Sequence, residues 1–393
     1  MFSLLIALIY ISFISLGLPD SLLGSAWPVM RAEFGAPVSL AGLVSMTISA
    51  GTIISSLMSD KITRKFGPGL VNAASCVLTA VALLGFSRAT APWMLFLWAI
   101  PYGLGAGGVD AALNNFAALH CTSRQMSWLH CFWGVGASIS PYIMSASLST
   151  RFGWQGGYLA VSLIQICLSV VLFASLPLWK RAIPSNDDSP DENKTPALGV
   201  KGALKITGVP FVLISFFAYC ALESTAGLWA STYLAEFRGV DAKTAAMFGS
   251  LFYLGITFGR FVNGFIADKF GDRKMIRFGG IAICIGLALI ILPLKTSIFA
   301  LCGLLVIGVG GAPIYPCIIH ATPDNFGAEN SQAIVGVQMA CAYTGSSLMP
   351  PVFGIIARHI SPGFYPLFMA IFAVLMIIST ERLNKIKKTS IQG

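Results

Sequence analysis

Four ionisable side chains lie within otherwise apolar stretches of the sequence: Asp20, Asp110, Glu223 and Arg260. His130, near the start of another apolar stretch, is a borderline fifth. Charged groups at membrane depth are costly and usually face a cavity or a partner. Carboxylates there can take up and release protons, and imidazole titrates near neutral pH. We therefore expect Asp20 and Asp110 to couple proton movement to another process. The alternative, that each acid makes a buried structural hydrogen bond, stays open.

Asp20 and Glu223 occupy matching positions in two related segments. The sequence Asp20-Ser-Leu-Leu-Gly24 aligns with Glu223-Ser-Thr-Ala-Gly227 at an offset of 203 residues. The glycine beside each acid allows a ligand or another backbone to come close. We expect the two acids to lie on opposite walls of one central cavity between the two halves of the molecule.

A second candidate site follows a glycine-rich run. Asp110 and Asn114 are four residues apart and share a helix face, where they can hold a proton and bind a hydroxyl group. The alternative is a polar contact between helices. Alignment of Gly103 with Gly308 puts Tyr315 at the position of Asp110, so the halves differ in role. The predicted substrate-binding residues are Asn114, Asn115, His130, Glu223, Trp229, Tyr315 and Gln338.

Arg260 lies eight residues before Asp268, so it should sit about 12 Å from one end of its helix. We expect it to pair with an acid in preference to contacting substrate. Trp229 and Tyr233 share a helix face, whereas Glu223 is about 600° around the helix from Trp229. We expect Glu223 to point into the cavity and Trp229 to lie at its rim.

The composition indicates a membrane protein. Hydrophobic residues make up 56% of the 393 residues and charged residues 10%, against about 25% charged in soluble domains. The net charge of +9 lies in short turns between apolar runs, so we expect no nucleic-acid partner. The nine cysteines form no CxxC pair, and we expect no metal, cofactor or disulfide. Without a nucleophile motif or phosphate loop, we expect no enzyme.

The apolar stretches predict twelve membrane helices of roughly 20 residues or more. An all-α membrane fold in two pseudo-symmetric six-helix halves follows. The expected divisions are an N-terminal half at 1–179, a cytoplasmic linker at 180–207, a C-terminal half at 208–381 and a cytoplasmic tail at 382–393. The segment Pro184–Pro196 has linker composition. The expected spans are 3–30, 39–58, 69–87, 92–118, 128–149, 154–178, 208–235, 244–267, 276–293, 298–320, 331–357 and 363–380.

Basic residues set the orientation. Loops on the side of the termini hold 17 Lys and Arg residues, against 7 on the other side. The positive-inside rule puts both termini and the linker in the cytoplasm, and we expect a monomer in a bacterial inner membrane.

A charged turn is repeated half a chain apart. Residues 264–274 read GFIADKFGDRK, and residues 56–66 read SLMSDKITRKF. We expect Asp60 and Asp268 each to end a helix and to pair with basic groups or a helix N-terminus when the cytoplasmic side is closed. The predicted gating residues are Asp60, Arg64, Arg260, Asp268, Lys269 and Arg273.

The doubled turn closely resembles the loop motif of the major facilitator superfamily, although Ser56 and Thr63 replace its usual glycines. Further stretches resemble the fucose:proton symporter branch of its sugar transporters. They are Asp20–Leu23, Asp110 with Asn114, Leu129-His130, Glu223 with Trp229, and Gly259-Arg260. In that branch a span-1 acid and a span-4 acid serve proton coupling and sugar recognition, which the resemblance carries to Asp20 and Asp110. The aspartate at 110 and Asn115 depart from the branch pattern, so the substrate does not carry over.

The resulting hypothesis is a secondary transporter that brings in a small polar solute, a sugar, together with protons by alternating access. The residues Gly136–Pro141 partly resemble the span-5 motif of drug/proton antiporters. A proton-coupled antiporter that exports an amphipathic compound or metabolite is therefore the alternative.

Overall fold

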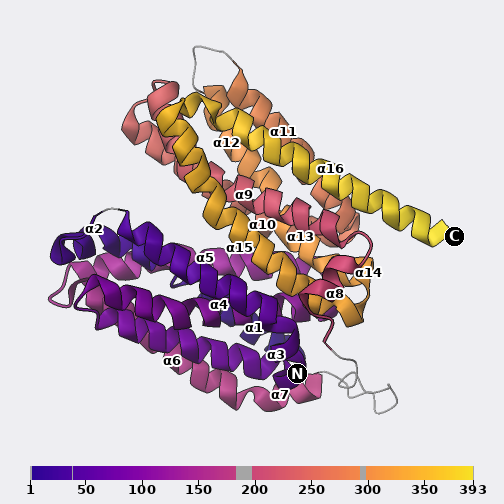
Figure 1. Cartoon of the computed structure of the whole chain (residues 1–393), viewed down its shortest axis with the longest axis horizontal. Coiled ribbons are helices and arrows are strands. Elements are labelled where there is room, and N and C mark those ends of the chain that lie inside the picture. The colour runs from indigo at the N-terminus through magenta and orange to yellow at the C-terminus, as the bar shows by residue number, and fades with distance from the viewer. Residues whose placement is uncertain (1, 38, 183–196, 293–297, 393) are drawn as a thin grey trace. The chain divides into compact units, whose positions relative to one another are not determined.

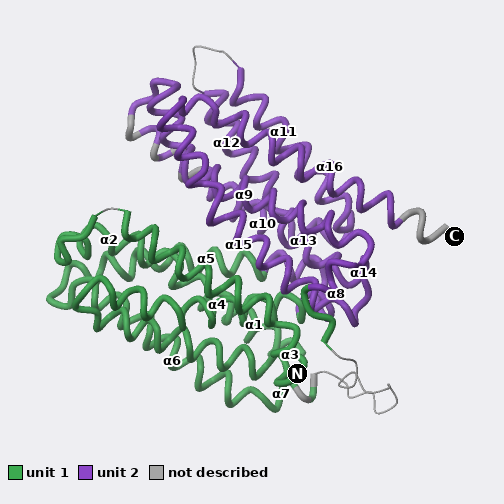
Figure 2. Tube along the Cα trace, in the orientation of Figure 1, with its two compact units in different colours: residues 1–116, 129–200 green, residues 117–128, 201–393 purple. Residues whose placement is uncertain are grey.

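The computed structural model describes residues 2–37, 39–182, 197–292 and 298–392, and all regular structure in these ranges is helical. The predicted all-α class is confirmed. The chain forms two compact units (Figure 2): unit 1 is residues 1–116 with 129–200, and unit 2 is residues 117–128 with 201–393. The predicted linker segment Pro184–Pro196 lies outside the described residues.

Unit 1 is built mainly from long helices of the first half of the chain (Figure 1). Its helices are α1 (Phe2–Gly17), α2 (Leu22–Phe34), α3 (Leu40–Ser87), α4 (Pro92–His120), α5 (Ser123–Leu148), α6 (Gly153–Ala174) and α7 (Leu176–Ala182). The end of α4 and the start of α5, residues 117–128, belong to unit 2, and we call this segment the α4–α5 tip.

Unit 2 repeats the long-helix pattern, and its fourth crossing is divided into the shorter helices α12 and α13. Its helices are α8 (Gly199–Lys205, shared with the end of unit 1), α9 (Val209–Thr232), η1 (Tyr233–Phe237), α10 (Ala242–Phe270), α11 (Asp272–Ile291), α12 (Ile298–Gly311), α13 (Ile314–His320), α14 (Thr322–Phe326), α15 (Ala328–His359), η2 (Pro362–Phe364) and α16 (Tyr365–Gln392).

The helices match the predicted spans. Eight helical stretches among the described residues are long and apolar enough to cross a membrane. One of them, α3, is 48 residues long and contains two predicted spans. The more polar helices α4, α5 and α10, of 29, 26 and 29 residues, correspond to three others. Large apolar side chains such as Val170, Ile281 and Ile371 remain exposed, as expected for a surface in lipid.

The prediction that Asp60 ends a helix is wrong. The helix continues through Asp60 and breaks at Gly67, whose φ is +76°. In the second copy of the turn the break is at Gly271, also at φ +76°. A left-handed backbone favours glycine, and the first copy has Thr63 where the second has Gly271. In the first copy the helix therefore breaks at the next glycine, Gly67, which precedes Pro68.

Helices α1 and α5 of unit 1 approach each other closely through two glycines. A Cβ atom at Gly17 would overlap the backbone oxygen of Trp133, and one at Gly136 would overlap that of Ile14. Such contacts between backbones are typical of membrane helices with small residues at their interface. The approach places Trp133 next to the end of α1.

We expect Gly136→Ala to destabilise the protein, because the new methyl group meets rigid backbone instead of a flexible side chain. Overpacking of this kind costs about 1–3 kcal/mol. Gly24→Ala is the matched control, since a Cβ there has no neighbour within 4 Å. The thermal unfolding midpoint in detergent should fall for Gly136→Ala and stay or rise for Gly24→Ala. Equal midpoints would show that the α1–α5 contact does not need the glycine.

Candidate functional site

Asp20 lies where the first predicted span is broken. Helix α1 ends at Gly17 and α2 begins at Leu22, so the acid stands between two half-helices. Its Oδ1 accepts a hydrogen bond from the Tyr102 hydroxyl (2.9 Å) and its Oδ2 accepts one from Trp133 Nε1 (3.0 Å). Both donors are neutral, and the Asp20 residue is exposed. Broken helices of this kind form substrate and ion sites in many transporters.

Asp110 and Asn114 share a face of α4, as predicted. Asn114 Nδ2 donates to Asp110 Oδ1 at 2.7 Å. His130 on α5 adds a third member, with its Nε2 3.1 Å from Asn114 Oδ1. Because the amide oxygen can only accept, His130 Nε2 carries a proton in this contact. All three residues are at least 95% buried, and Asn115 is buried beside them. The arrangement links a carboxylate to an imidazole through one amide.

In unit 2, Arg260 and Glu223 form an ion pair. The Arg260 Nη2 atom lies 3.2 Å from Glu223 Oε1, and the two side chains are 5% and 20% exposed. The prediction that Arg260 pairs with an acid is confirmed. A paired carboxylate and guanidinium together carry no net charge, which lowers the cost of holding both at membrane depth.

Three other predicted binding residues, Trp229, Tyr315 and Gln338, pack within unit 2. Trp229 Nε1 donates to the backbone oxygen of Pro350 (2.9 Å), and Gln338 exchanges hydrogen bonds with Thr322 (3.1 and 3.2 Å) while fully buried. Tyr315 donates to Met339 Sδ (3.4 Å). To contact a solute, each would have to exchange these partners. Tyr233, which was expected to share a helix face with Trp229, is stacked on an aromatic ring of α16.

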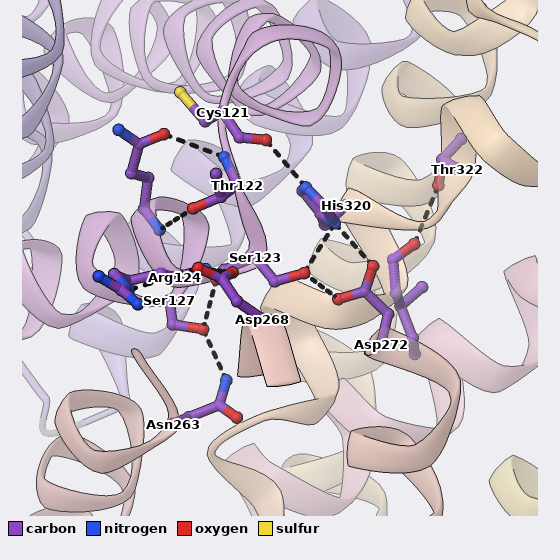
Figure 3. A network of polar contacts seen from close by, with 12 residues as sticks. Cys121, Thr122, Ser123, Arg124, Ser127, Asn263, Asp268, Asp272, His320 and Thr322 are labelled. Carbon is purple, nitrogen blue, oxygen red and sulfur yellow. Dashed lines mark hydrogen bonds and ion pairs between the residues drawn. The ribbon is translucent and has the colours of Figure 1, made fainter. Parts of the chain in front are cut away.

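A polar network joins the α4–α5 tip to α10, α11 and α13 within unit 2 (Figure 3). Asp268 Oδ1 accepts the backbone N–H of Arg124 at 2.9 Å, and its Oδ2 lies 3.4 Å from Arg124 Nε. Asp268 therefore contacts a basic residue at a helix N-terminus in this structure; that the contact belongs to the closed cytoplasmic side stays a prediction. Ser127 accepts a hydrogen bond from Asn263 Nδ2 at 2.6 Å.

His320 and Asp272 complete this network, and the sequence analysis missed both. His320 Nδ1 is 2.6 Å from Asp272 Oδ2, and Nε2 is 2.9 Å from the carbonyl oxygen of Cys121. Ser123 Oγ donates to Asp272 Oδ1 at 2.7 Å. Both imidazole nitrogens thus face oxygen acceptors. A neutral imidazole has one N–H and can donate to one of these oxygens. To make both contacts, either the imidazole or the Asp272 carboxylate must hold one additional proton.

The other predicted gating residues make contacts of their own. Asp60 is buried and accepts from Arg64 Nε (2.7 Å) and from the backbone N–H of Gly199 (3.1 Å). Arg273 donates to Asn325 at 3.4 Å, and Lys269 lies 5.8 Å from the centre of the Phe270 ring. In the described ranges no three His, Cys, Asp or Glu side chains gather as a metal-ligand set.

Residues 9–350 match the family model described as the Major Facilitator Superfamily. The chain belongs to this family. Together with the described helices, the match confirms the twelve-helix fold in two six-helix halves and identifies a multi-pass membrane transporter of the superfamily.

Similar proteins in the superfamily differ in what their names say they carry. The gentisate transporter of Corynebacterium glutamicum is 24% identical, over 95% of this chain and 84% of its own. The sialic acid transporter NanX of Escherichia coli is 27% identical, over 82% and 77%. The solved structure of a point variant of the E. coli fucose:proton symporter FucP has a TM-score of 0.75 and 15% identity, covering 97% of this chain and 98% of that one. At this identity the structural likeness shows the fold alone.

Proposed function

We propose that the protein is a proton-coupled symporter of a small polar solute, a sugar. The observation that carries the proposal is Asp20, an exposed carboxylate in a helix break whose hydrogen bonds come from the neutral side chains of Tyr102 and Trp133. A carboxylate held by neutral donors can gain and lose a proton without breaking an ion pair. Asp110, with Asn114 and His130, is the second proposed proton site.

The solute class rests on charge. Glu223 and Arg260 neutralise each other in unit 2, so this ion pair offers no net charge to attract an ionic solute. Hydroxyl-rich, uncharged molecules fit such a site, with Asn114 and Asn115 as hydrogen-bonding amides. The names of the gentisate and sialic acid transporters favour carboxylated solutes as the second candidate class.

The proposed cycle is alternating access. Asp20 or Asp110 takes a proton from the outer side, the solute binds between the halves (1–179 and 208–381), and the halves rock. The proton and the solute leave to the cytoplasm, on the side of the termini, the linker at 180–207 and the tail at 382–393. Neutralising an acid lowers the cost of closing it into a low-dielectric site. We propose that one chain suffices, in a bacterial inner membrane.

Uptake into proteoliposomes tests the function. With the outside one pH unit more acid than the inside, we expect a labelled neutral sugar to accumulate, and a protonophore to abolish the accumulation. Gentisate and sialic acid are the comparison solutes. If gentisate or sialic acid accumulates and the neutral sugar does not, the sugar proposal is wrong and carboxylated solutes are the substrate class. Accumulation only with the gradient reversed would contradict symport and support the exporting antiporter.

A further inference from the structure

Unit 1 contains a small cavity between α1, α3, α4 and α6, lined by both polar and apolar residues, that the proposed function does not use. It offers about 20 Å³ to the centres of water-sized molecules. On this measure one water needs about 10–15 Å³, so the space suits one or two. Among the described residues, the lining has no carboxylate and no basic side chain, and its polar members include Ser12, Ser15, Asn72, Thr79, Tyr102 and Gln165.

Two of the lining residues, Asn72 and Gln165, have amide oxygen atoms without a hydrogen-bond partner among the described residues. Asn72 Nδ2 donates to Ser12 Oγ (3.1 Å), which itself donates to the carbonyl oxygen of Leu8 (2.9 Å). Gln165 Nε2 donates to the carbonyl oxygen of Ser15 (2.8 Å). These acceptors fix the orientation of both amides. Asn72 Oδ1 and Gln165 Oε1 have no hydrogen-bond partner among the described residues, and both residues are 1% exposed.

The ligand that suits these atoms is water. Two acceptor oxygens require a donor of hydrogen bonds, and a water molecule supplies two. Metal cations that bind oxygen ligands are usually held by carboxylates, and the lining residues that the structure describes include none. Buried polar groups are normally satisfied by such ordered water when no side chain reaches them.

Tyr102 connects the cavity with Asp20. The residue lines the cavity, and its hydroxyl donates to Asp20 Oδ1 at 2.9 Å. The hydroxyl oxygen keeps a lone pair that can accept from a water molecule. A hydroxyl that donates on one side and accepts on the other can pass a proton along.

We propose that the cavity holds ordered water and that Tyr102 passes protons between this water and Asp20. A hydronium ion in the cavity gives one proton to Tyr102 Oη while the original hydroxyl proton moves to Asp20 Oδ1. The step leaves neutral water, neutral tyrosine and a protonated Asp20, and it reverses when Asp20 releases its proton. The relay rests on the proposed role of Asp20 as a proton carrier.

The water site is tested in the parent protein by X-ray hydroxyl-radical footprinting in lipid nanodiscs, with Cys76 as a native reporter in the cavity lining. We expect Cys76 to be oxidised at a rate several-fold above that of Cys220, which is buried in unit 2. Filling the cavity with Gln165→Leu should lower the rate at Cys76. An unmodified Cys76 in the parent would overturn the water site. Protection of Cys76 by Na⁺ at constant ionic strength would also overturn it, in favour of a cation.

The relay is tested by the rate at which Asp20 takes up a proton after a pH jump. Infrared spectroscopy follows its carboxylic C=O band, assigned by its loss in Asp20→Asn. We expect Tyr102→Phe to slow uptake at least tenfold and to change its solvent deuterium isotope effect. The matched control is Tyr158→Phe, which removes another buried hydroxyl of unit 1, outside the cavity lining.

The possible failures separate the two proposals. If Asp20 titrates in the parent and Tyr102→Phe keeps the parent rate and isotope effect, the relay is wrong and Asp20 can still carry protons. If the parent and Asp20→Asn show the same carboxyl bands and transport does not depend on the pH gradient, the proposed function itself is wrong.

Discussion

Asp110→Asn is expected to abolish uphill accumulation driven by a pH gradient while the protein still exchanges solute. A gradient of one pH unit supports up to about tenfold accumulation at one proton per solute, since one unit is worth about 1.4 kcal/mol. The variant cannot bind or release the coupling proton, so its inside-to-outside ratio should approach about one. Its amide oxygen can still accept the hydrogen bond from Asn114 that Asp110 Oδ1 accepts at 2.7 Å. The local fold should therefore persist.

Asp324→Asn is the matched control, because it makes the same chemical change at an exposed position of α14. It should accumulate solute like the parent. Counterflow exchange measures whether Asp110→Asn still binds and carries solute. Asp20→Asn should lose accumulation as well if the two acids act in one pathway. Parent-like accumulation in both Asp110→Asn and Asp20→Asn would show that neither acid carries the proton.

The second large effect concerns the α4–α5 tip. Asp268→Asn is expected to release the tip from α10, because it removes the charge that faces the N-terminus of α5 and Arg124. We propose that this contact closes the cytoplasmic side, so its loss should shift the resting population toward inward-open. Cysteine labelling from the cytoplasmic side should rise.

Cys121 is a native reporter within the tip. Burial raises the pKa of its thiol to about 11, and the thiolate is the reactive form. Release of the tip into water would return the pKa toward its ordinary value of 9.0 and raise the thiolate fraction at neutral pH by up to about a hundredfold. We expect maleimide labelling of Cys121 to accelerate at least several-fold in Asp268→Asn, and the Cys121→Ala variant gives the background.

Asp241→Asn controls for the loss of an acid from the same helix. Asp241 caps the far end of α10, and asparagine caps about as well, so Cys121 should react as in the parent. Unchanged or slower labelling of Cys121 in Asp268→Asn would contradict the gating role of Asp268.

Local patterns in the sequence predicted most of the elements and several contacts. Apolar runs of about 20 residues located the spans, and the four-residue spacing of Asp110 and Asn114 predicted their shared face. The cost of a buried charge predicted that Arg260 would have an acidic partner. Each of these predictions depends on neighbouring residues or on a general energetic rule.

Contacts that join distant segments were not predictable in the same way. Tyr102 and Trp133 are 82 and 113 residues from Asp20, and nothing in their neighbourhood marks them as its donors. Ser123, Asp272 and His320 come from three segments and look like ordinary residues near helix ends. The prediction that a helix ends at Asp60 was wrong for a local reason. Thr63 stands where the second copy of the turn has Gly271, and threonine disfavours the left-handed backbone conformation that Gly271 adopts.

The contact between the tip and α10 has a four-residue period on both sides. On α5, Arg124 and Trp128 are one turn apart; on α10, Asp268 and Gly264 are also one turn apart. Arg124 contacts Asp268, and Trp128 lies against Gly264, where a Cβ atom would overlap the indole. To bring the next residue of either helix onto the contacting face, the helix would have to turn by about 100°, which would break both contacts together. The helices can therefore separate as a unit, but they have no intermediate register in which one contact survives.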